Sequence, residues 1–230
     1  MLARTLEAAV GWTKPPYIIA ETDSGFELDL VRQVMKSLGH KINPIYVPYG
    51  RSYSMLENNQ VDLTLTLSEQ VGVHISKLSD VYVTYQNVAI SLKKSNVTIN
   101  QIADLQHYSV VAFQNARMLL NKTFSDAVAK NDMYIELPYQ RNQVEMLFNG
   151  NTDVVVMDIN IFNHLSRELT GKNQMEKVNV HNLFPLNHYR VGFADPVLRY
   201  DFNQALGNFV ETQEYRDLVK KYDLHTISIN

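Results

Sequence analysis

The acidic side chain that best combines burial with a possible binding role is Asp158, which ends the apolar run 154–158. A carboxylate at the end of a buried strand is costly unless it is paired. In a closed cleft it could form a strong charge-assisted bond with an ammonium group. The same residue directly precedes a helix expected over residues 159–169, so it could instead cap that helix. The two roles are compatible, and we predict Asp158 as a ligand-binding residue.

A second candidate lies where a strand expected over residues 109–113 runs into a helix expected over residues 116–127. Backbone N–H groups at such a helix start favour an anion. The side chain of Arg117 could add a positive charge there, although on a helix face it could equally be solvated. We therefore predict that Asn115 and Arg117 contact the ligand.

Aromatic and uncharged polar side chains supply further candidates. Trp12 and Tyr17 flank a Pro-Pro turn and could form a wall for an apolar or cationic part of a solute, with core packing as the alternative. Thr66 and Ser68 close an expected strand and could donate hydroxyl hydrogen bonds. Gln140 follows another expected strand and could do the same.

The chain repeats one phrase, and the repeat indicates which elements carry these residues. Leu-Glu-Asn-Asn-Gln-Val-Asp at 56–62 runs into the strand-like segment 63–66, and Leu-Phe-Asn-Gly-Asn-Thr-Asp at 147–153 runs into 154–158. Each copy has the pattern of a helix end, a tight Asn/Gly turn, an Asp and a buried strand. The repetition predicts two similar α/β lobes, and paired lobes bind small ligands in the cleft between them.

Strands alternate with helices along the chain, which is typical of an α/β protein with largely parallel sheets. Segments near residues 93–96 and 184–188 are expected to cross between the lobes. They predict a discontinuous first lobe, residues 1–93 plus 188–230, and an inserted second lobe, residues 94–187. A hinge of two crossing segments suits closure around a ligand.

The best-defined amphipathic helix spans about residues 26–38, where apolar residues recur on one stripe. Ser24 and Glu27 are expected to form a capping box at its start. Gly39 is expected to end it.

The composition excludes several classes of protein. The 230 residues carry a net charge of −3 and no basic cluster that could follow a phosphate backbone, so nucleic acid is not an expected partner. The absence of cysteine excludes disulfides and thiolate chemistry. No apolar run in the sequence is long enough to span a bilayer, and the N-terminus lacks the pattern of a signal peptide. The chain is therefore expected to be cytoplasmic or to begin at a mature sequence.

Little in the sequence indicates catalysis. His74, His164 and His188 are scattered without the spacing of a metal site, so no metal and no cofactor is expected. Neither a Gly-x-Ser-x-Gly turn nor a phosphate-binding loop occurs. An acid or base in a cleft would have to come from Glu21, Asp158 or His188, and we predict no catalytic residues.

Taken in order, several segments resemble the family 3 extracellular solute-binding proteins, which have the type II periplasmic binding fold. Gly25-Phe26-Glu27-Leu28-Asp29 resembles the Gly-Phe-x-x-Asp start of a helix in that family. The other similar segments are 12–17, 56–66, 78–82, 102–105, 149–158 and 215–223. The resemblance covers nearly the whole chain and implies a periplasmic or cell-surface protein that binds amino acids or other small polar solutes for an ABC importer. The same fold also serves as a sensor domain of membrane-bound kinases and cyclases, and a few relatives are cyclohexadienyl dehydratases.

The resemblance implies roles for particular residues, and this chain departs from some of them. In amino-acid-binding relatives the residue matching Asp158 takes the ligand's ammonium group, and a Gly-Thr pair, replaced here by Asn115-Ala116, holds its carboxylate. An Arg that clamps the same carboxylate is missing, and Gln70, which stands nearest its position, brings no charge. Arg51 or Arg117 could substitute, although Arg51 could equally be a surface or lobe-bracing residue. The departures argue against a conventional α-amino acid as the ligand.

The sequence therefore predicts an α/β, two-lobed, monomeric and non-enzymatic periplasmic protein whose signal peptide has been removed. It is expected to capture a small polar, amino-acid-like solute between its lobes and to deliver it to an ABC permease. The alternative is a ligand-sensing domain of a membrane receptor, a kinase or cyclase. A cyclohexadienyl-dehydratase-like enzyme is the third hypothesis.

Overall fold

The computed structural model describes residues 4–48, 50–69 and 73–225. The chain divides into two compact units: unit 1 contains Met1–Thr84 and Asn187–Asn230, and unit 2 contains Tyr85–Leu186. Strand β4 (Leu78–Leu92) runs through the first division without a break. Residues 93–96, where the sequence predicted a crossing between lobes, therefore follow directly after the end of this strand.

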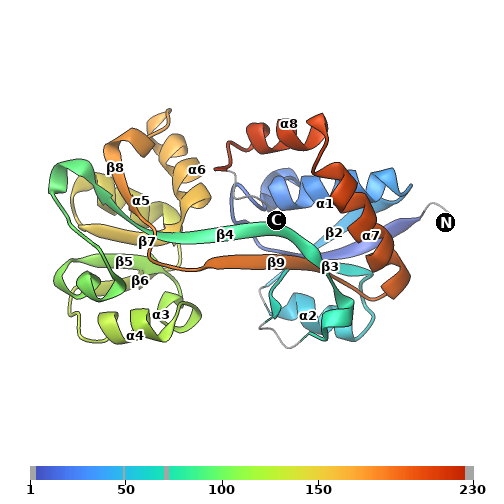
Figure 1. Cartoon of the computed structure of the whole chain (residues 1–230), viewed down its shortest axis with the longest axis horizontal. Coiled ribbons are helices and arrows are strands. Elements are labelled where there is room, and N and C mark those ends of the chain that lie inside the picture. Colours follow the sequence, from blue (N-terminus) through green and yellow to red (C-terminus); the bar gives the residue numbers. More distant parts are fainter. Residues whose placement is uncertain (1–3, 49, 70–72, 226–230) are drawn as a thin grey trace. The chain divides into compact units, whose positions relative to one another are not determined.

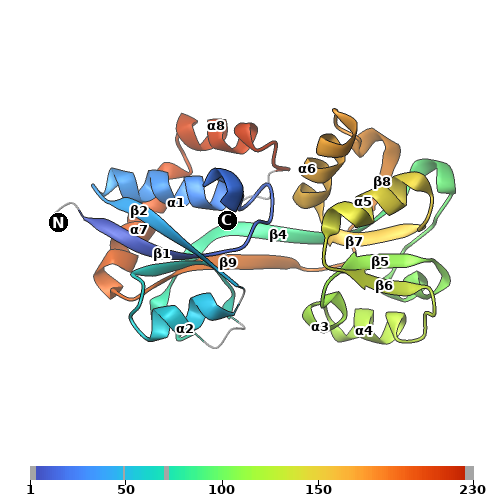
Figure 2. The same ribbon diagram turned by 180° about the vertical axis from the view of Figure 1, so that it is seen from behind.

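Unit 1 is built on a sheet in which three neighbouring strands are parallel and the next is antiparallel (Figure 1). Across the sheet the strands follow the order β2 (Lys41–Val47), β1 (Thr5–Gly11), β3 (Leu63–Leu67) and β9 (Leu186–Phe193). Its helices include α1 (Phe26–Ser37), α2 (Arg51–Glu57), α7 (Pro196–Phe209) and α8 (Gln213–Lys221), with 3-10 turns at Ala20–Thr22 and Ile75–Lys77. In both views α1 and α2 lie on opposite faces of the sheet (Figures 1 and 2), and α7 and α8 pack against α1.

Unit 2 has a sheet of the same kind. The strands follow the order β4, β7 (Val154–Asp158), β5 (Val110–Phe113) and β6 (Tyr134–Leu137), and β8 (Val178–His181) pairs with β4. Its helices include α3 (Ala116–Leu119), α4 (Lys122–Val128), α5 (Gln140–Asn149) and α6 (Ile159–Thr170), with 3-10 turns at Lys93–Ser95, Ile102–His107 and Met175–Lys177. Strands β7, β5 and β6 are parallel and β4 runs antiparallel to β7. In both views α5 and α6 cover one face of the sheet and α3 and α4 the other (Figure 2).

The repeated phrase occupies the same place in each unit, the turn from α2 into β3 and the turn from α5 into β7. Asn59 and Gly150 adopt φ of 53° and 75°, the left-handed conformation that these residue types tolerate best. The following N–H groups, of Gln60 and Asn151, each bond to a carbonyl five residues back at 2.9 Å. Both helices thus end in the same hydrogen-bonded turn.

The repeated Asp has one function in both copies. Asp62 accepts a hydrogen bond from the backbone N–H of Glu7 at 2.8 Å, and Asp153 accepts one from that of Ser109 at 2.9 Å. The acceptor stands just before β3 or β7, and the donor lies at the start of the neighbouring strand β1 or β5. The Asp therefore joins two adjacent parallel strands at their amino ends. The α/β class and the repeat of one supersecondary unit, both predicted from the sequence, are confirmed.

The start of α1 differs from the predicted capping box. The residue before the helix is Gly25, at φ 120°, and no side chain caps the helix. A Cβ at Gly25 would lie 2.3 Å from the carbonyl oxygen of Tyr17, so only glycine fits. Ser24 instead bonds to the hydroxyl of Thr22 at 2.7 Å, and Glu27 is fully buried among other partners. The prediction of a capping box was wrong, because buried partners from other elements bind the Glu27 side chain.

The core of unit 2 gathers on the face of its sheet that α4 covers. Phe124 is fully buried, and its ring lies edge-on to Tyr134 and Phe184 at centroid distances of 5.8 and 5.5 Å. Such aromatic contacts add to the free energy of burial. In the described parts of the chain no helix is both long and apolar enough to cross a membrane.

Candidate functional site

The predicted site residues fall at the carboxyl ends of the parallel strands, where open α/β sheets bind ligands. In unit 1 this edge, called edge 1, carries Trp12 after β1, Arg51 after β2, and Thr66 and Ser68 at the end of β3. In unit 2 the equivalent edge, called edge 2, carries Asn115 and Arg117 after β5, Gln140 after β6 and Asp158 at the end of β7. Apart from Tyr17, the described candidates of each unit thus follow the carboxyl ends of its parallel strands. Gln70 lies outside the described residues.

The two aromatic candidates of unit 1 differ clearly in solvent exposure. Trp12 is 59% exposed, while Tyr17 has no exposed surface. Burial favours core packing for Tyr17, whose backbone carbonyl also accepts the N–H of Glu27 at 3.0 Å. Trp12 offers a large aromatic face on edge 1. Arg51, the first residue of α2, is exposed.

The hydroxyl of Thr66 is used inside unit 1. Thr66 is 8% exposed, and its Oγ1 donates to a carboxylate oxygen of Glu27 at 2.6 Å. Its backbone N–H donates to the Tyr82 hydroxyl at 3.0 Å, and that hydroxyl donates to the same Glu27 oxygen. In this arrangement an internal carboxylate takes the proton of the Thr66 hydroxyl, and a contact between Thr66 and a solute stays a prediction. Ser68, two residues further, is half-buried and remains a candidate.

Asp158 is the N-cap of α6. It is 2% exposed, and its Oδ1 accepts the N–H groups of Asn160 and Ile161 at 2.9 and 3.1 Å. Its Oδ2 accepts the N–H of Gln86, on β4, at 2.9 Å. Three backbone donors thus stabilise the buried charge. Of the two roles left open by the sequence, the structure shows capping and adds a bond to a neighbouring strand.

The anion expected at the start of α3 is supplied by the chain itself. Asn115 stands at φ 66°, and the backbone N–H groups of Asn115 and Arg117 donate to the carboxylate of Glu136 at 2.6 and 2.9 Å. The hydroxyl of Tyr134 also donates to Glu136, at 2.7 Å. Burial, and then the bond to Glu136, raise the pKa of Tyr134, so this hydroxyl stays protonated and remains a donor. The Arg117 side chain is exposed.

Glu136 was missed by the sequence analysis. It lies on β6 opposite Ala112 of β5, and Tyr134 shares its face of the strand. The alternating pair Tyr134 and Glu136 on a short strand was the available signal. Gln140, at the start of α5, is half-buried.

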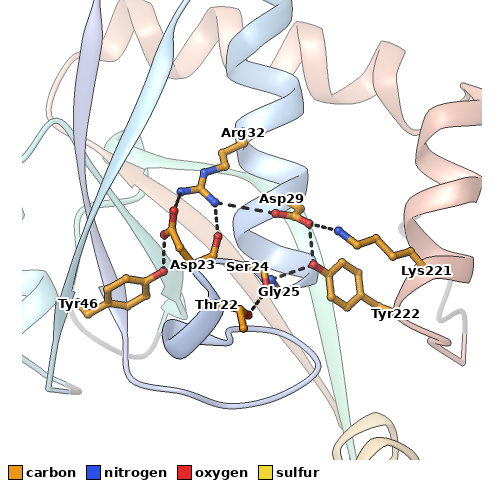
Figure 3. Close-up of polar contacts among 9 residues, drawn as sticks. All are labelled: Thr22, Asp23, Ser24, Gly25, Asp29, Arg32, Tyr46, Lys221 and Tyr222. Atoms are coloured by element: carbon orange, nitrogen blue, oxygen red, sulfur yellow. Dashed lines mark hydrogen bonds and ion pairs between the residues drawn. The ribbon is translucent and has the colours of Figure 1, made fainter.

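Two polar networks anchor the amino end of α1 (Figure 3). Asp23 accepts hydrogen bonds from Arg32 at 2.6 Å and from the hydroxyl of Tyr46 at 2.7 Å. Although partial burial works the other way, these two partners lower the pKa of Asp23. The charged groups here therefore pair with one another, and their contacts stabilise the loop before α1.

The second network ties α8 to α1. Asp29 accepts from Lys221 at 2.7 Å and from the Tyr222 hydroxyl at 2.6 Å, and Tyr222 in turn accepts the N–H of Gly25 at 3.0 Å (Figure 3). The hydrogen bond to Asp29 raises the pKa of Lys221. Burial, followed by the bond to Asp29, raises the pKa of Tyr222.

The groups considered for acid–base chemistry have structural partners. Glu21 accepts the Thr13 hydroxyl at 2.6 Å, which lowers the pKa of Glu21. Nδ1 of His188 lies 3.1 Å from the Thr84 hydroxyl. Among the described residues no group of three or more His, Asp and Glu side chains is arranged to hold a metal ion.

One surface hollow of about 460 Å³ lies away from both edges, between the end of α1 and α7 in unit 1. Leu38, Ala205 and Phe209 give it an apolar lining, and Asp201 is its single charged residue. Since none of the candidates lines it, the hollow is separate from the candidate site.

The architecture is that of the type II periplasmic binding proteins. Several solved structures are similar to this chain over almost its whole length. A histidine kinase sensor domain with similarity to periplasmic binding proteins is 16% identical, covers 95% of each chain and has a TM-score of 0.70. An ancestral cationic amino acid solute-binding protein is 17% identical, covers 95% of each chain and has a TM-score of 0.72. An ABC uptake transporter substrate-binding protein from Streptococcus pneumoniae, solved with bound histidine, is 17% identical, with 95% of this chain and 92% of that chain covered and a TM-score of 0.67.

A family model for bacterial extracellular solute-binding proteins, family 3, matches residues 6–225. The chain belongs to this family, as the resemblance of its motifs predicted. The comparison with curated protein sequences gives no match.

Proposed function

We propose that the chain is a periplasmic binding protein that captures a small polar solute with the residues of edges 1 and 2 and passes it to a membrane ABC permease. The observation that carries the proposal is the placement of the candidates at the carboxyl ends of equivalent parallel strands in two copies of one α/β unit. Family membership supports it. Capture by both units would shift an open–closed equilibrium that a membrane partner could sense.

The Glu136 carboxylate of edge 2 favours a solute that carries an amine or another cationic group. Glu136 accepts three hydrogen bonds, from two backbone N–H groups and the Tyr134 hydroxyl. A carboxylate has about four acceptor positions, so one is left for a further donor. The amide pair that could otherwise hold an anionic ligand group already holds Glu136. Together with the uncharged Gln70 of the sequence, this disfavours a solute bound through its own carboxylate.

The first test is a thermal-shift and calorimetric screen of the purified chain. The panel contains L-arginine, L-histidine, L-glutamate, agmatine, putrescine and simple organic acids. A solute at a hundredfold excess over its Kd should stabilise the protein by about 2.7 kcal/mol. We expect cationic solutes to bind and organic acids not to. Binding of acids without amines would contradict the proposed solute class, and no shift with any small solute would contradict solute capture.

A variant pair tests the role of Glu136. Glu136→Gln removes the charge and should weaken a cationic solute about tenfold, the loss expected for one charge-assisted bond. Asp126→Asn is the matched control, because Asp126 is an exposed carboxylate of unit 2 paired only with Lys122 among the contacts described. It should leave the affinity unchanged. Equal affinities of all three proteins would rule out a contribution from Glu136.

The second candidate function is a ligand-sensing domain of a membrane receptor. The likeness to a histidine kinase sensor domain favours it, with similar coverage and TM-score to those of the transport proteins. Sequencing the natural gene separates the two: a transmembrane helix encoded after Asn230 would support the sensor, and a stop codon would support the free binding protein. We propose no catalytic activity, and prephenate-like acids should not be turned over.

A further inference from the structure

Strand β3 ends in a bulge with an unusual residue in it. The pairing register between β3 and β9 shifts between Thr64 and Leu67. Within that interval Thr66 adopts φ of 59°. A β-branched residue is strained in this left-handed conformation, which bulges normally give to glycine. Strain of this kind persists only where the surroundings enforce it.

A closed ring of hydrogen bonds enforces it here. The Thr66 N–H donates to the Tyr82 hydroxyl at 3.0 Å, the Tyr82 hydroxyl donates to Glu27, and the Thr66 hydroxyl donates to the same Glu27 oxygen at 2.6 Å. Both Glu27 and Tyr82 have no exposed surface. Burial raises the pKa of Tyr82 well above its ordinary value, so its hydroxyl remains a donor. The backbone and side chain of Thr66 are thus held from both sides by groups that solvent does not reach.

We propose that Glu27 and Tyr82 are positioning residues that hold the bulge at Thr66 and thereby set the direction of the chain at Ser68 on edge 1. Both residues act through Thr66, since neither has exposed surface with which to touch a solute. Bulges commonly re-aim side chains next to binding sites. The positioning of the backbone stands on the geometry of unit 1 alone, whereas its effect on solute affinity rests on the proposed function.

The test measures amide hydrogen exchange of Thr66, Leu67 and Ser68 by NMR in the absence of solute. Glu27→Gln and Tyr82→Phe should each speed exchange at these amides about tenfold beyond any change in global stability, the effect of one lost buried hydrogen bond. Thr64→Val is the matched control, because Thr64 is a buried residue of the same strand whose hydroxyl bonds to the Ala9 carbonyl at 3.1 Å. It should lower stability without a local effect at the bulge.

A rescue separates positioning from simple core stability. Glycine occupies the left-handed conformation without strain, so Thr66→Gly should keep the bulge and remove its dependence on the ring. In the Thr66→Gly background, Glu27→Gln should change local exchange by less than about threefold. If Glu27→Gln and Tyr82→Phe change exchange only as much as Thr64→Val does, or if Thr66→Gly restores nothing, the proposal is overturned.

Solute binding adds a second readout with L-arginine as the probe. If L-arginine binds the wild-type chain, Glu27→Gln should raise its Kd about tenfold and the added Thr66→Gly should recover most of the affinity. An unchanged Kd in Glu27→Gln would overturn the link from the bulge to the site. If L-arginine does not bind, the exchange data still decide the positioning role, and the Kd comparison is made with whichever cationic solute of the panel binds the wild-type chain.

Discussion

Replacing Asp158 by Ala should destabilise the protein strongly, because three backbone N–H groups lose their acceptor. Loss of the N-cap of α6 costs about 1 kcal/mol, within a range of about 0.5–2. The N–H of Gln86 loses its Oδ2 partner as well, and a buried unsatisfied donor costs about 1–3 kcal/mol. The expected loss is therefore about 2–4 kcal/mol in the free energy of unfolding. Asp158→Asn, which keeps an oxygen for the cap, should lose less.

Urea unfolding followed by circular dichroism measures these losses, with Asn121→Ala as the control. Asn121 is an exposed N-cap in the same unit, and its side chain accepts only the Phe124 N–H among the contacts described. Its loss should cost about 1 kcal/mol. If Asp158→Ala costs no more than Asn121→Ala, the bond to Gln86 contributes nothing and the reasoning fails. A solute-binding defect in Asp158→Ala alone would not distinguish ligand contact from this loss of structure.

Three further outcomes are expected. Gly25→Ala should destabilise unit 1 by about 3 kcal/mol or more in urea unfolding, because the new Cβ would meet the Tyr17 carbonyl; a near-neutral variant would contradict the close approach. Folding raises the pKa values of Lys221 and Tyr222, so their contribution to stability is complete below about pH 10 and is lost as pH rises further. The protection of the α8 amides, corrected for the base-catalysed intrinsic exchange rate, should therefore fall selectively at alkaline pH; an equal fall in protection across unit 1 would contradict this. Trp12→Ala should change stability by less than about 0.5 kcal/mol while weakening solute binding in calorimetry, and unchanged binding would remove Trp12 from the site.

Local patterns in the sequence were enough to predict the repeated architecture. The strand expected at 154–158 and the helix at 159–169 correspond to β7 and to α6, which ends at Thr170. Both depend on the spacing of apolar residues and on a capping Asp, which are properties of neighbouring residues. The repeated Asp could be recognised as a shared feature, although its bond to the neighbouring strand became visible only in the structure.

One helix was predicted wrongly, because local signals compete within it. The helix expected over residues 116–127 is broken into α3 and α4, because the side chain of Asn121 accepts the Phe124 N–H and starts a second helix. Apolar periodicity alone does not show which of several polar residues will cap.

The contacts of the candidate site residues could not be predicted from the sequence, because they join distant parts of the chain. Glu27 meets Thr66 across 39 positions of sequence, and Glu136 meets Asn115 across 21. A single sequence indicates that a buried carboxylate needs a partner but does not identify the partner. The left-handed conformation of Thr66 was hidden for a related reason, since its residue type favours an ordinary strand.

The order of strands within each sheet has a consequence for the newly made chain. Strand β3 is followed along the chain by β4, yet its antiparallel neighbour in unit 1 is β9, which is complete only at Phe193. Unit 2, by contrast, has all of its residues once Leu186 has been made. Unit 2, which begins second, can therefore complete its sheet first. Until β9 has been synthesised, β3 has an unpaired edge that could pair with other chains. A truncated half of this protein would keep that open edge permanently.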